Sequence, residues 1–420
     1  AFGIAPAVAA GRHDLVSGLK GASAAVAPRT STLRSALVVT QIAVSLVAVV
    51  VAALFVRTLQ NLRTVNPGYD VQEIFYVQMK LRPAGYSEIR GAQFYNEIVQ
   101  RIRAVPGVRA ATLANSMPPG WMWGLDFELQ SRPLRSGERP LQAGKNTVGP
   151  GYFETLGARF VAGRGFNAGD TEKSPRVAVI NETMARQFWP GESALGKRFR
   201  RVAPFGPHPW IEVVGIARDG KYEYLGEPAR AHILVPFTQN YEPNMKIVVR
   251  ATNIPLVMPA VSREILAFDP NLPAPQLKTA VEHLSESLAN ERVNASAISL
   301  SGLLTLLLTA VGLFGVVSFT VAQRTREIGI RVALGARPAD VVRPMMSEGV
   351  RLIAAGLAAG VLMALGAVRL LASSLYGLGA VDAVSFGGGA ALLAGVTLLA
   401  CWLPARRALR VDPIEALRCE

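Results

Sequence analysis

Four long blocks of apolar residues, almost free of charge, constrain what this chain can fold into. A helix needs about 20 residues to cross the hydrocarbon core of a bilayer, which is roughly 30 Å thick. Blocks of that length run over Ser35–Val56, Asn294–Gln323, Leu352–Leu371 and Ala383–Ala405. One such block alone could be a buried helix of a soluble core. Four of them in one chain predict a membrane protein with four transmembrane α-helices.

Positive charges beside these blocks predict their orientation, because cytoplasmic loops of membrane proteins are enriched in Lys and Arg. The segment 1–34 carries four basic residues and one acid, the connection 324–351 carries six arginines, and the tail 406–420 carries four. The turn 372–382, between the third and fourth blocks, carries none. We therefore expect both ends and the 324–351 connection in the cytoplasm. The turn and the long segment 57–293 are expected outside.

Two glycines of the third block predict close helix packing. Gly356 and Gly360 are four residues apart, so they lie on one face of a helix. Small residues at this spacing let helices approach closely in lipid. We expect this face to pack in a helix bundle or a dimer.

The segment 57–293 is long enough to fold as a large domain between the first and second spans. Strand-like and helix-like patterns follow one another along it, which predicts a mixed α/β (α+β) fold. A helix is expected over Ser87–Val105, capped by Ser87. Four apolar residues are expected on its buried face: Ile89, Phe94, Ile98 and Ile102.

Two strand–helix–strand patterns in this segment suggest a split subdomain. The first begins at Glu73, and the second covers a strand near Asn244, a helix over Ile254–Phe268 and a further strand. They flank an insertion of about 118–238, which we expect to form a second subdomain. The last stretch, Thr279–Arg292, is expected to be helical and to run into the second span. No cysteine lies in the whole segment, so no disulfide can hold it together.

Motifs of enzymes and nucleic-acid binders are missing from the sequence. The formal charge is +14, but the basic residues gather beside the apolar blocks and form no stripe interleaved with aromatics. Gly191–Arg198 matches part of a phosphate loop, yet Arg198 stands where the loop needs Ser or Thr. Gly163–Gly169 predicts only a turn, and the four histidines show no metal-ligand spacing. We expect no catalytic residue, no metal, no cofactor bound by this chain and no nucleic-acid partner.

One loop of the outer segment is rich in large apolar side chains. Met117–Gly124 places Trp121, Met122 and Trp123 among proline and glycine. The loop is either tucked onto the core of the domain or an exposed apolar tip that contacts a substrate or a partner.

The 324–351 connection combines charged residues with small ones. Its apolar residues, Ile328, Val332 and Leu334, are interspersed with charges, so a short helix along the membrane face is plausible. Charge suits a soluble partner and small side chains permit close approach, which suggests a docking surface; an ordinary charged loop is the alternative. The candidate contact residues are Arg324, Arg326, Glu327, Gly329, Arg331, Gly335 and Ala336.

Four stretches resemble one known family. The string REIGIRVALGA at Arg326–Ala336 resembles the signature of the FtsX/MacB family of ABC transporter permeases, and the ending LPARRALRVDPIEALRCE resembles that family's C-terminus. GYFETLGARFVAGRGF and VAVINETMARQFWPGESALGKRF resemble the MacB-type periplasmic core domain. The resemblance covers nearly the whole chain from Ser31 onward.

The resemblance implies a topology, partners and a function. It implies four spans with the core domain between the first two, in a bacterial plasma (inner) membrane. A separate ATPase subunit would bind ATP and dock at 324–336, and a second permease unit would be present as a fused repeat or a homodimer. The implied function is to couple ATP hydrolysis to movements of the outer domain for export or efflux. An FtsX-like signal relay, which regulates an extracytoplasmic hydrolase without transport, remains the alternative.

The residues before the first span resemble the end of the chain. With a constant offset between Pro6–Lys20 and Pro404–Arg418, Arg12 falls on Arg410 and Asp14 on Asp412. This match predicts that 1–34 includes the tail of a preceding copy of the same unit. The chain would then be the C-terminal half of a duplicated permease.

Overall fold

The computed structural model describes residues 28–135, 137–202, 208–323, 338–371, 375–377 and 382–408. These residues form two compact units. The first is a helical unit that contains most of each of four long helices. The second contains residues 55–296 together with 375–377. We call the second unit the outer domain.

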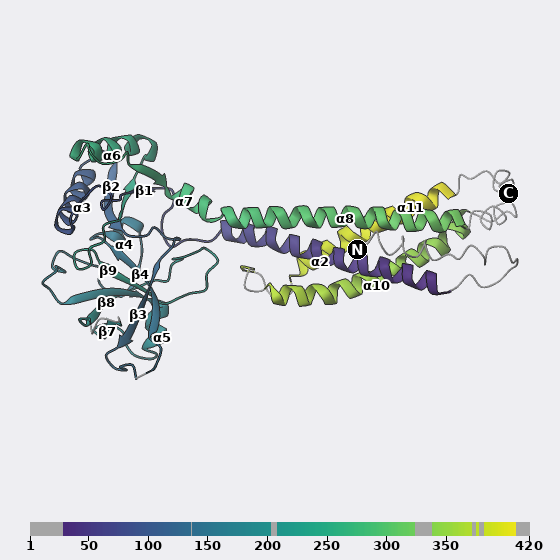
Figure 1. Ribbon diagram of the computed structural model, residues 1–420, viewed down its shortest axis with the longest axis horizontal. Coiled ribbons are helices and arrows are strands. Elements are labelled where there is room, and N and C mark those ends of the chain that lie inside the picture. The colour runs from purple at the N-terminus through teal and green to yellow at the C-terminus, as the bar shows by residue number, and fades with distance from the viewer. Residues whose placement is uncertain are drawn as a thin grey trace. The chain divides into compact units, whose positions relative to one another are not determined.

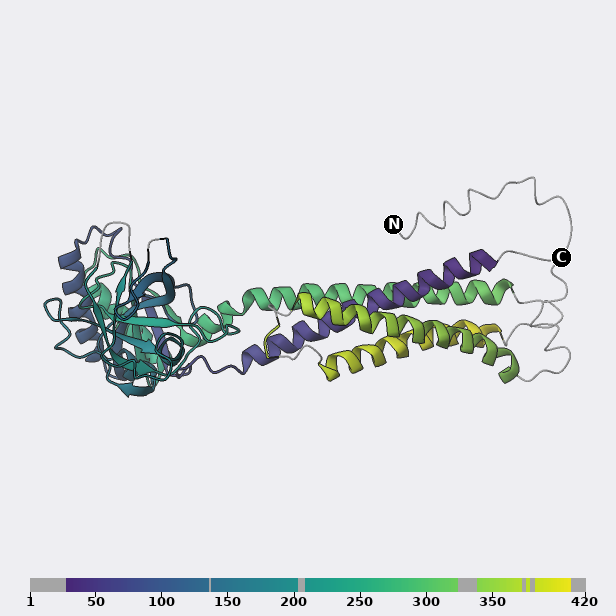
Figure 2. The ribbon, with the colours of Figure 1, turned by 90° about the horizontal axis from the view of Figure 1, so that it is seen from below.

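Each helix of the helical unit contains a stretch that is long and apolar enough to cross a membrane. The helices are α2 (Pro28–Arg63), α8 (Ala289–Gln323), α10 (Pro338–Leu370) and α11 (Ala383–Ala408), and they run alongside one another (Figures 1 and 2). Their candidate spans are Ser35–Arg63, Ala289–Phe319, Gly349–Leu370 and Ala383–Pro404. The four predicted spans are therefore confirmed as helices. The first two extend beyond the predicted bounds toward the outer domain.

Small and polar residues hold this bundle together. A Cβ atom added at Gly356 would lie 2.7 Å from Ile42 Cβ, so α10 approaches α2 closely, as the glycine spacing predicted. The next turn repeats the contact, with Gly360 against Leu46. Between α2 and α8, the hydroxyl of Ser45 is hydrogen-bonded to that of a buried threonine, Thr309. Such contacts can hold helices together in lipid, where the burial of apolar side chains gives no net driving force for helix association.

The first half of the outer domain is a four-stranded sheet covered by two helices. Its strands are β1 (Ile74–Gln78), β2 (Val108–Ala114), β10 (Lys246–Ala251) and β11 (Gln276–Thr279). β10 lies between β1 and β2 and is antiparallel to both, so the strands form a split β–α–β unit. The helices α3 (Glu88–Arg103) and α6 (Ile254–Phe268) pack on each other and on this sheet (Figure 1).

The helix α3 matches its predicted range, but one predicted buried residue is wrong. The Ser87 side chain accepts a hydrogen bond from the main-chain N–H of Arg90, as expected of an N-cap. Phe94, Ile98 and Ile102 are buried, whereas Ile89 is 74% exposed. The reason is geometric, because Ile89 precedes Phe94 by five residues and so lies about 140° around the helix from it.

The second half of the outer domain falls within the predicted insertion and is a closed barrel. Its strands are β3 (Trp123–Leu129), β4 (Leu141–Val148), β5 (Phe160–Gly163), β6 (Arg176–Asn181), β7 (Arg198–Arg201), β8 (Ile211–Ala217) and β9 (His232–Pro236), and its short helices are α4 (Tyr152–Leu156) and α5 (Glu182–Phe188). Pairings join β3 to β4, β4 to β9, β9 to β6, β6 to β8, β8 to β7 and β7 back to β3. The remaining strand, β5, pairs with β8.

A short helix leads from the outer domain into α8. This helix, α7 (Ala280–Ser287), begins with a capping box formed by Thr279 and Glu282. A turn at Leu288 separates it from α8, although the N–H of Leu288 still donates to Leu284 O at 3.2 Å. The expected helix into the second span is therefore present with one break.

Candidate functional site in the outer domain

The stretch Met117–Gly124, which we call the tryptophan loop, combines a buried base with an exposed tip. Pro118 and Pro119 are buried and joined by a cis peptide bond. Trp121 is 71% exposed and Trp123 is 61% exposed, and their rings meet edge to face with centroids 4.4 Å apart. Met122, between them, is buried. The loop is therefore tucked onto the domain at its base and exposed at its tip, and contact of the tip with a substrate or a partner stays a prediction.

Hydrogen bonds from three directions hold the base of the tryptophan loop. The hydroxyl of Tyr69 donates to Pro118 O at 2.6 Å. The N–H of Gly120 donates to Tyr222 O at 2.8 Å. From α7, His283 Nε2 lies 3.0 Å from Met117 O and 2.8 Å from Pro119 O. The exposed tryptophans are thus carried on a fixed support.

The partners of His283 determine its protonation. Two carbonyl oxygens face Nε2 and can only accept, so Nε2 carries a proton and donates. The hydroxyl of Tyr76 lies 3.2 Å from Nδ1 and donates to it. Burial lowers the pKa of His283, with the carbonyl contacts opposing this shift. The ring is therefore held neutral between Tyr76 and the tryptophan loop.

A second buried histidine lies beside the loop in β9. His232 stacks on Tyr222 with ring centroids 3.8 Å apart, and its Nε2 is buried without a hydrogen-bond partner among the described residues. Burial lowers the pKa of His232 to about 3. His232, Tyr222 and Met122 line a pocket of about 390 Å³.

A cleft in the outer domain has a volume of about 670 Å³. Its lining comes from the segment that follows α2, from the base of the tryptophan loop, from α4 and the residues after it, and from the end of β8. No sequence motif indicates this cleft, because its walls come from segments that are far apart in the sequence. Its polar lining residues include Tyr69, Asp70, Tyr152, Arg159, Arg218, Asp219 and Arg250.

An apolar cluster, which we call the collar, joins three segments that continue into the membrane helices. Leu62 lies near the end of α2, Leu288 lies between α7 and α8, and Tyr376 lies in the connection between α10 and α11. They pack with Leu225 of the outer domain. Asn61 Nδ2 also donates to Tyr376 O at 3.4 Å, and Lys221 Nζ lies 5.3 Å from the centre of the Tyr376 ring.

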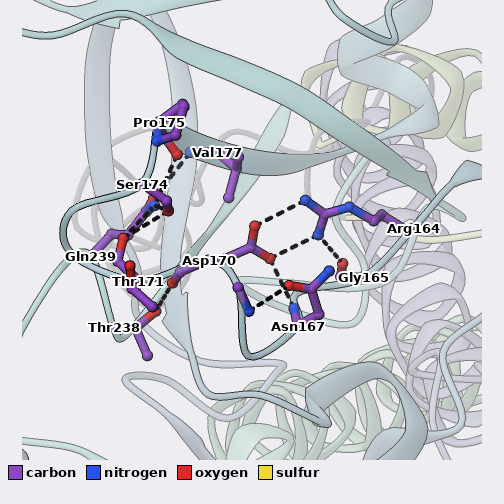
Figure 3. A network of polar contacts seen from close by, with 11 residues as sticks. Arg164, Gly165, Asn167, Asp170, Thr171, Ser174, Pro175, Val177, Thr238 and Gln239 are labelled. Atoms are coloured by element: carbon purple, nitrogen blue, oxygen red, sulfur yellow. Dashed lines mark hydrogen bonds and ion pairs between the residues drawn. The ribbon is translucent and has the colours of Figure 1, made fainter.

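The two glycine-rich stretches are structural turns. In the first, Arg164 forms two hydrogen bonds, of 2.8 and 2.9 Å, to the Asp170 carboxylate, which also accepts from the N–H of Asn167 at 2.8 Å (Figure 3). Burial opposes the charge on Asp170, but these hydrogen bonds outweigh it and lower the pKa of the carboxyl. The turn contacts the segment after β9, where Thr238 Oγ1 donates to Asp170 O at 2.5 Å. In the second stretch, Lys197 pairs with Glu192 at 2.6 Å, and the stretch runs from a helix into a strand, unlike a phosphate loop.

The predicted docking residues lie outside the described residues. They are Arg324, Arg326, Glu327, Gly329, Arg331, Gly335 and Ala336. The N-terminal stretch that resembles the chain's own tail also lies outside them. Both assignments remain predictions. Within the described residues, no group of His, Cys, Asp or Glu has the arrangement of a metal site.

Four apolar helices and a split α/β domain between the first two define a membrane protein of the permease type. The model of the MacB-like periplasmic core domain matches residues 35–267, and that of the FtsX-like permease C-terminal region matches residues 299–413. The chain therefore belongs to the MacB/FtsX-like family of ABC transporter permeases.

Curated relatives of this chain are bacterial exporters by name. The macrolide export ATP-binding/permease protein MacB 1 of Aeromonas hydrophila is 28% identical over 313 residues, which are 68% of this chain and 45% of that protein. MacB of Rhodospirillum rubrum is 29% identical over 66% of this chain and 43% of its own length. The pyoverdine export protein PvdT of Pseudomonas savastanoi is 42% identical over 28% of this chain and 18% of its own. The chain thus spans less than half of the length of these relatives.

A solved structure similar to the chain is the periplasmic region of MacB from Actinobacillus actinomycetemcomitans. The two share 12% identity, with a TM-score of 0.37, over 56% of this chain and 98% of that one.

Proposed function

We propose that this chain is the permease component of an ABC exporter, which couples ATP hydrolysis by a separate ATPase subunit to movements of its outer domain. The collar is the observation that carries this proposal. Leu62 lies at the end of α2, Leu288 directly precedes α8, and Tyr376 lies between α10 and α11, and these residues form one cluster with Leu225. A shift of any of these helices would therefore be transmitted to Leu225 through close-packed side chains.

Family membership supports the ATP-driven part of the proposal. The names of the relatives combine an ATP-binding part with a permease part, whereas this chain matches less than half of the length of each. ATP would then be bound by the partner, and this chain would neither catalyse a reaction nor hold a cofactor. A second permease unit, fused or as a homodimer, would complete the transporter.

The arginine distribution supports the proposed orientation in the membrane. The connection 324–351 and both ends would face the cytoplasm of a bacterial inner membrane, with the outer domain on the opposite side. The ATPase would contact Arg324, Arg326, Glu327, Gly329, Arg331, Gly335 and Ala336.

Export is favoured over signal relay by the relatives. Their names specify export of a macrolide or of pyoverdine, and the outer domain matches the MacB-like model. A relay protein would instead bind a hydrolase through its outer domain. Recovery of a cell-wall hydrolase with the full chain would reverse this preference.

Substitution of Tyr376 tests the coupling. Tyr376→Ala removes a ring that packs against Leu62 and Lys221, and it should lower cargo-stimulated ATPase activity of the assembled complex severalfold without loss of the bound ATPase. Tyr224→Ala is the matched control, because Tyr224 is 44% exposed and outside the collar. Equal stimulation in both variants would refute a role of the collar in coupling.

Charge reversal tests the docking surface separately. Glu327→Arg combined with Arg331→Glu should abolish ATPase binding and stimulation, because both partners of any ion pair would face like charges. Arg139→Glu, which alters an exposed arginine of the outer domain, should leave both unchanged. If the reversed variant kept its ATPase, the docking assignment would be wrong.

A further inference from the structure

The large cleft of the outer domain has the size and the composition of a ligand site. Its volume of about 670 Å³ falls within the range of about 300–1,000 Å³ that is typical of small-molecule pockets. Phe153, Leu156, Ala217 and Leu234 give it apolar walls, and three tyrosines line it as well. An organic molecule with an apolar body would find both surface to bury and hydrogen-bonding groups to contact.

One of the three tyrosines offers an unused hydrogen bond. Tyr152 is 5% exposed, and its hydroxyl makes no hydrogen bond to any described residue. The hydroxyl oxygen is not fully enclosed by protein atoms. It is therefore accessible from the cleft that Tyr152 lines. Burial raises the pKa of this phenol, which therefore stays protonated and can donate. By contrast, the hydroxyl of Tyr69 is already used by Pro118 O.

Two arginines beside the tyrosines have no ion-pair partner among the described residues. Arg159 and Arg218 both line the cleft and both are exposed. The N–H of Arg218 donates to Arg159 O at 2.9 Å, so the two residues lie side by side where β5 meets β8. Like charges in that relation repel each other unless an anion lies near both.

Of the other charged groups of the cleft, three already have ion-pair partners and the fourth is held by a carbonyl. Arg250 pairs with Glu73 at 2.8 Å and with Asp70 at 3.3 Å. Asp219 pairs with Arg186 at 2.9 Å. Lys221 Nζ donates to a main-chain carbonyl, Glu227 O, at 2.6 Å, which holds the ammonium group but leaves its charge. Among the described residues, the positive charges of the cleft without a carboxylate partner are therefore those of Arg159, Arg218 and Lys221, and the two arginines lie side by side.

We propose that this cleft binds an organic anion with an aromatic or other apolar body. Its acidic group would lie between Arg159 and Arg218, its body would rest on Phe153, Leu156 and Leu234, and an acceptor atom would meet the Tyr152 hydroxyl. The proposal goes beyond the export function, because it holds whether the ligand is cargo or an effector.

The cleft also contacts the segment that leaves α2. Residues 66–70 form one wall, and Gly68 has φ +98°, a conformation that favours glycine. A Cβ atom there would lie 3.4 Å from Gly220 Cα, so this segment packs closely against the segment after β8. A bound ligand would therefore touch the part of the outer domain that continues directly from the first membrane helix.

Equilibrium dialysis with matched probes tests the proposal on the purified full chain in a neutral detergent. The probes are 2-naphthoate, 2-naphthylmethanol, 2-naphthylmethylammonium and acetate, with empty micelles as the blank. Saturable binding of naphthoate, and at least tenfold weaker binding of the other three, is expected. Equal binding of the alcohol or tighter binding of the ammonium probe would overturn the anion assignment, and failure of naphthoate to bind would overturn the site.

Variants then locate the binding. Arg159→Gln with Arg218→Gln should weaken naphthoate binding about tenfold or more, because the charge-assisted hydrogen bonds to its carboxylate are lost. Tyr152→Phe should weaken it about threefold and leave the thermal midpoint unchanged, since the hydroxyl has no hydrogen-bond partner among the described residues. Arg139→Gln and Tyr224→Phe, outside the cleft, are the controls. Unchanged affinity in the cleft variants would place the probe elsewhere and refute the proposal.

These outcomes are independent of transport. If the cleft variants no longer bind naphthoate but the complex still shows cargo-stimulated ATPase activity, the cleft is an effector site. If naphthoate binding is intact in Tyr376→Ala while stimulation is lost, the coupling and the site are shown to be separate.

Discussion

His283 Nε2 donates to the carbonyl oxygen of Pro119 at 2.8 Å. His283 lies in α7, which leads into the membrane helix α8, and Pro119 lies in the base of the loop that carries Trp121 and Trp123. One side chain therefore connects the entry to a membrane span with the exposed aromatic tip. A movement at the start of α8 would reach the tryptophan loop by this contact.

We expect His283→Phe to destabilise the outer domain and loosen the tryptophan loop. The substitution keeps a ring beside Tyr76 but leaves the carbonyls of Met117 and Pro119 without their donor, and each unsatisfied buried group costs about 1–3 kcal/mol. Thermal unfolding of the full chain and iodide quenching of its tryptophans would measure both effects. Val281→Ala, at an exposed position of the same helix, should change neither. Equal thermal midpoints in the two variants would show that the contact is dispensable.

The buried His232 predicts acid sensitivity. Its pKa is about 6.5 in the unfolded chain and about 3 in the folded one. Well above pH 6.5 the histidine is neutral in both states, and it does not lower the free energy of unfolding. Below about pH 6.5 the histidine binds a proton in the unfolded state but not in the folded state. Stability then falls by up to about 1.4 kcal/mol per pH unit until about pH 3.

His232→Phe should remove this acid sensitivity. His232 Nε2 has no hydrogen-bond partner among the described residues, and phenylalanine preserves the stacking on Tyr222. We expect a smaller shift of the unfolding midpoint between pH 7 and pH 5.5 than in the wild type. His208→Gln, at an exposed position, should keep the wild-type slope. The same slope in all three proteins would argue against His232 as the source.

The contact of α10 with α2 predicts that Gly356 tolerates no side chain. A Cβ atom would lie 2.7 Å from two carbons of Ile42, so Gly356→Ala must push the helices apart, at a cost of about 1–3 kcal/mol. Gly387→Ala is a matched control in another span, because nothing lies within 4 Å of the added atom. The thermal midpoint in detergent should drop only for the first variant. A drop of equal size in both would mean that the loss of glycine itself, and not the contact, matters.

The exposed tryptophans should matter for transport but not for stability. Trp121→Ala combined with Trp123→Ala removes solvent-exposed rings, and changes at such positions usually alter stability by less than about 0.5 kcal/mol. We expect export by the complex to fall severalfold. The buried Trp189 offers the contrast, since Trp189→Ala should cost about 3–5 kcal/mol of stability. Normal export by the double variant would leave the loop without a role in transport.

Features that depend on local sequence were predicted well. The apolar blocks, the Ser87 cap and the helix over Ile254–Phe268 each rest on neighbouring residues, and the structure has them as expected. Ile89 was misplaced because a spacing of five was taken as one helical face. The Gly356 contact was expected in kind, but the sequence did not name Ile42 as its partner.

Features that depend on distant segments were not predicted. The barrel closes because β7 pairs with β3 and β9 pairs with β4, and no local pattern encodes either pairing. The same holds for the cleft, which both Tyr152 and Arg218 line, and for the collar, where Tyr376 packs with the cluster that contains Leu62.

The sequence by itself determined that this chain has four membrane spans, and it located a large α/β domain between the first and second. Hydrophobic length, charge asymmetry and helical periodicity are properties of contiguous residues, so they can be predicted without a structure. Tertiary structure alone decided that the tryptophan loop rests on His283, that Tyr376 belongs to the collar, and that Arg159 and Arg218 share one cleft. The physical reason is that these relations arise from packing between segments whose separation in sequence carries no signal of their contact.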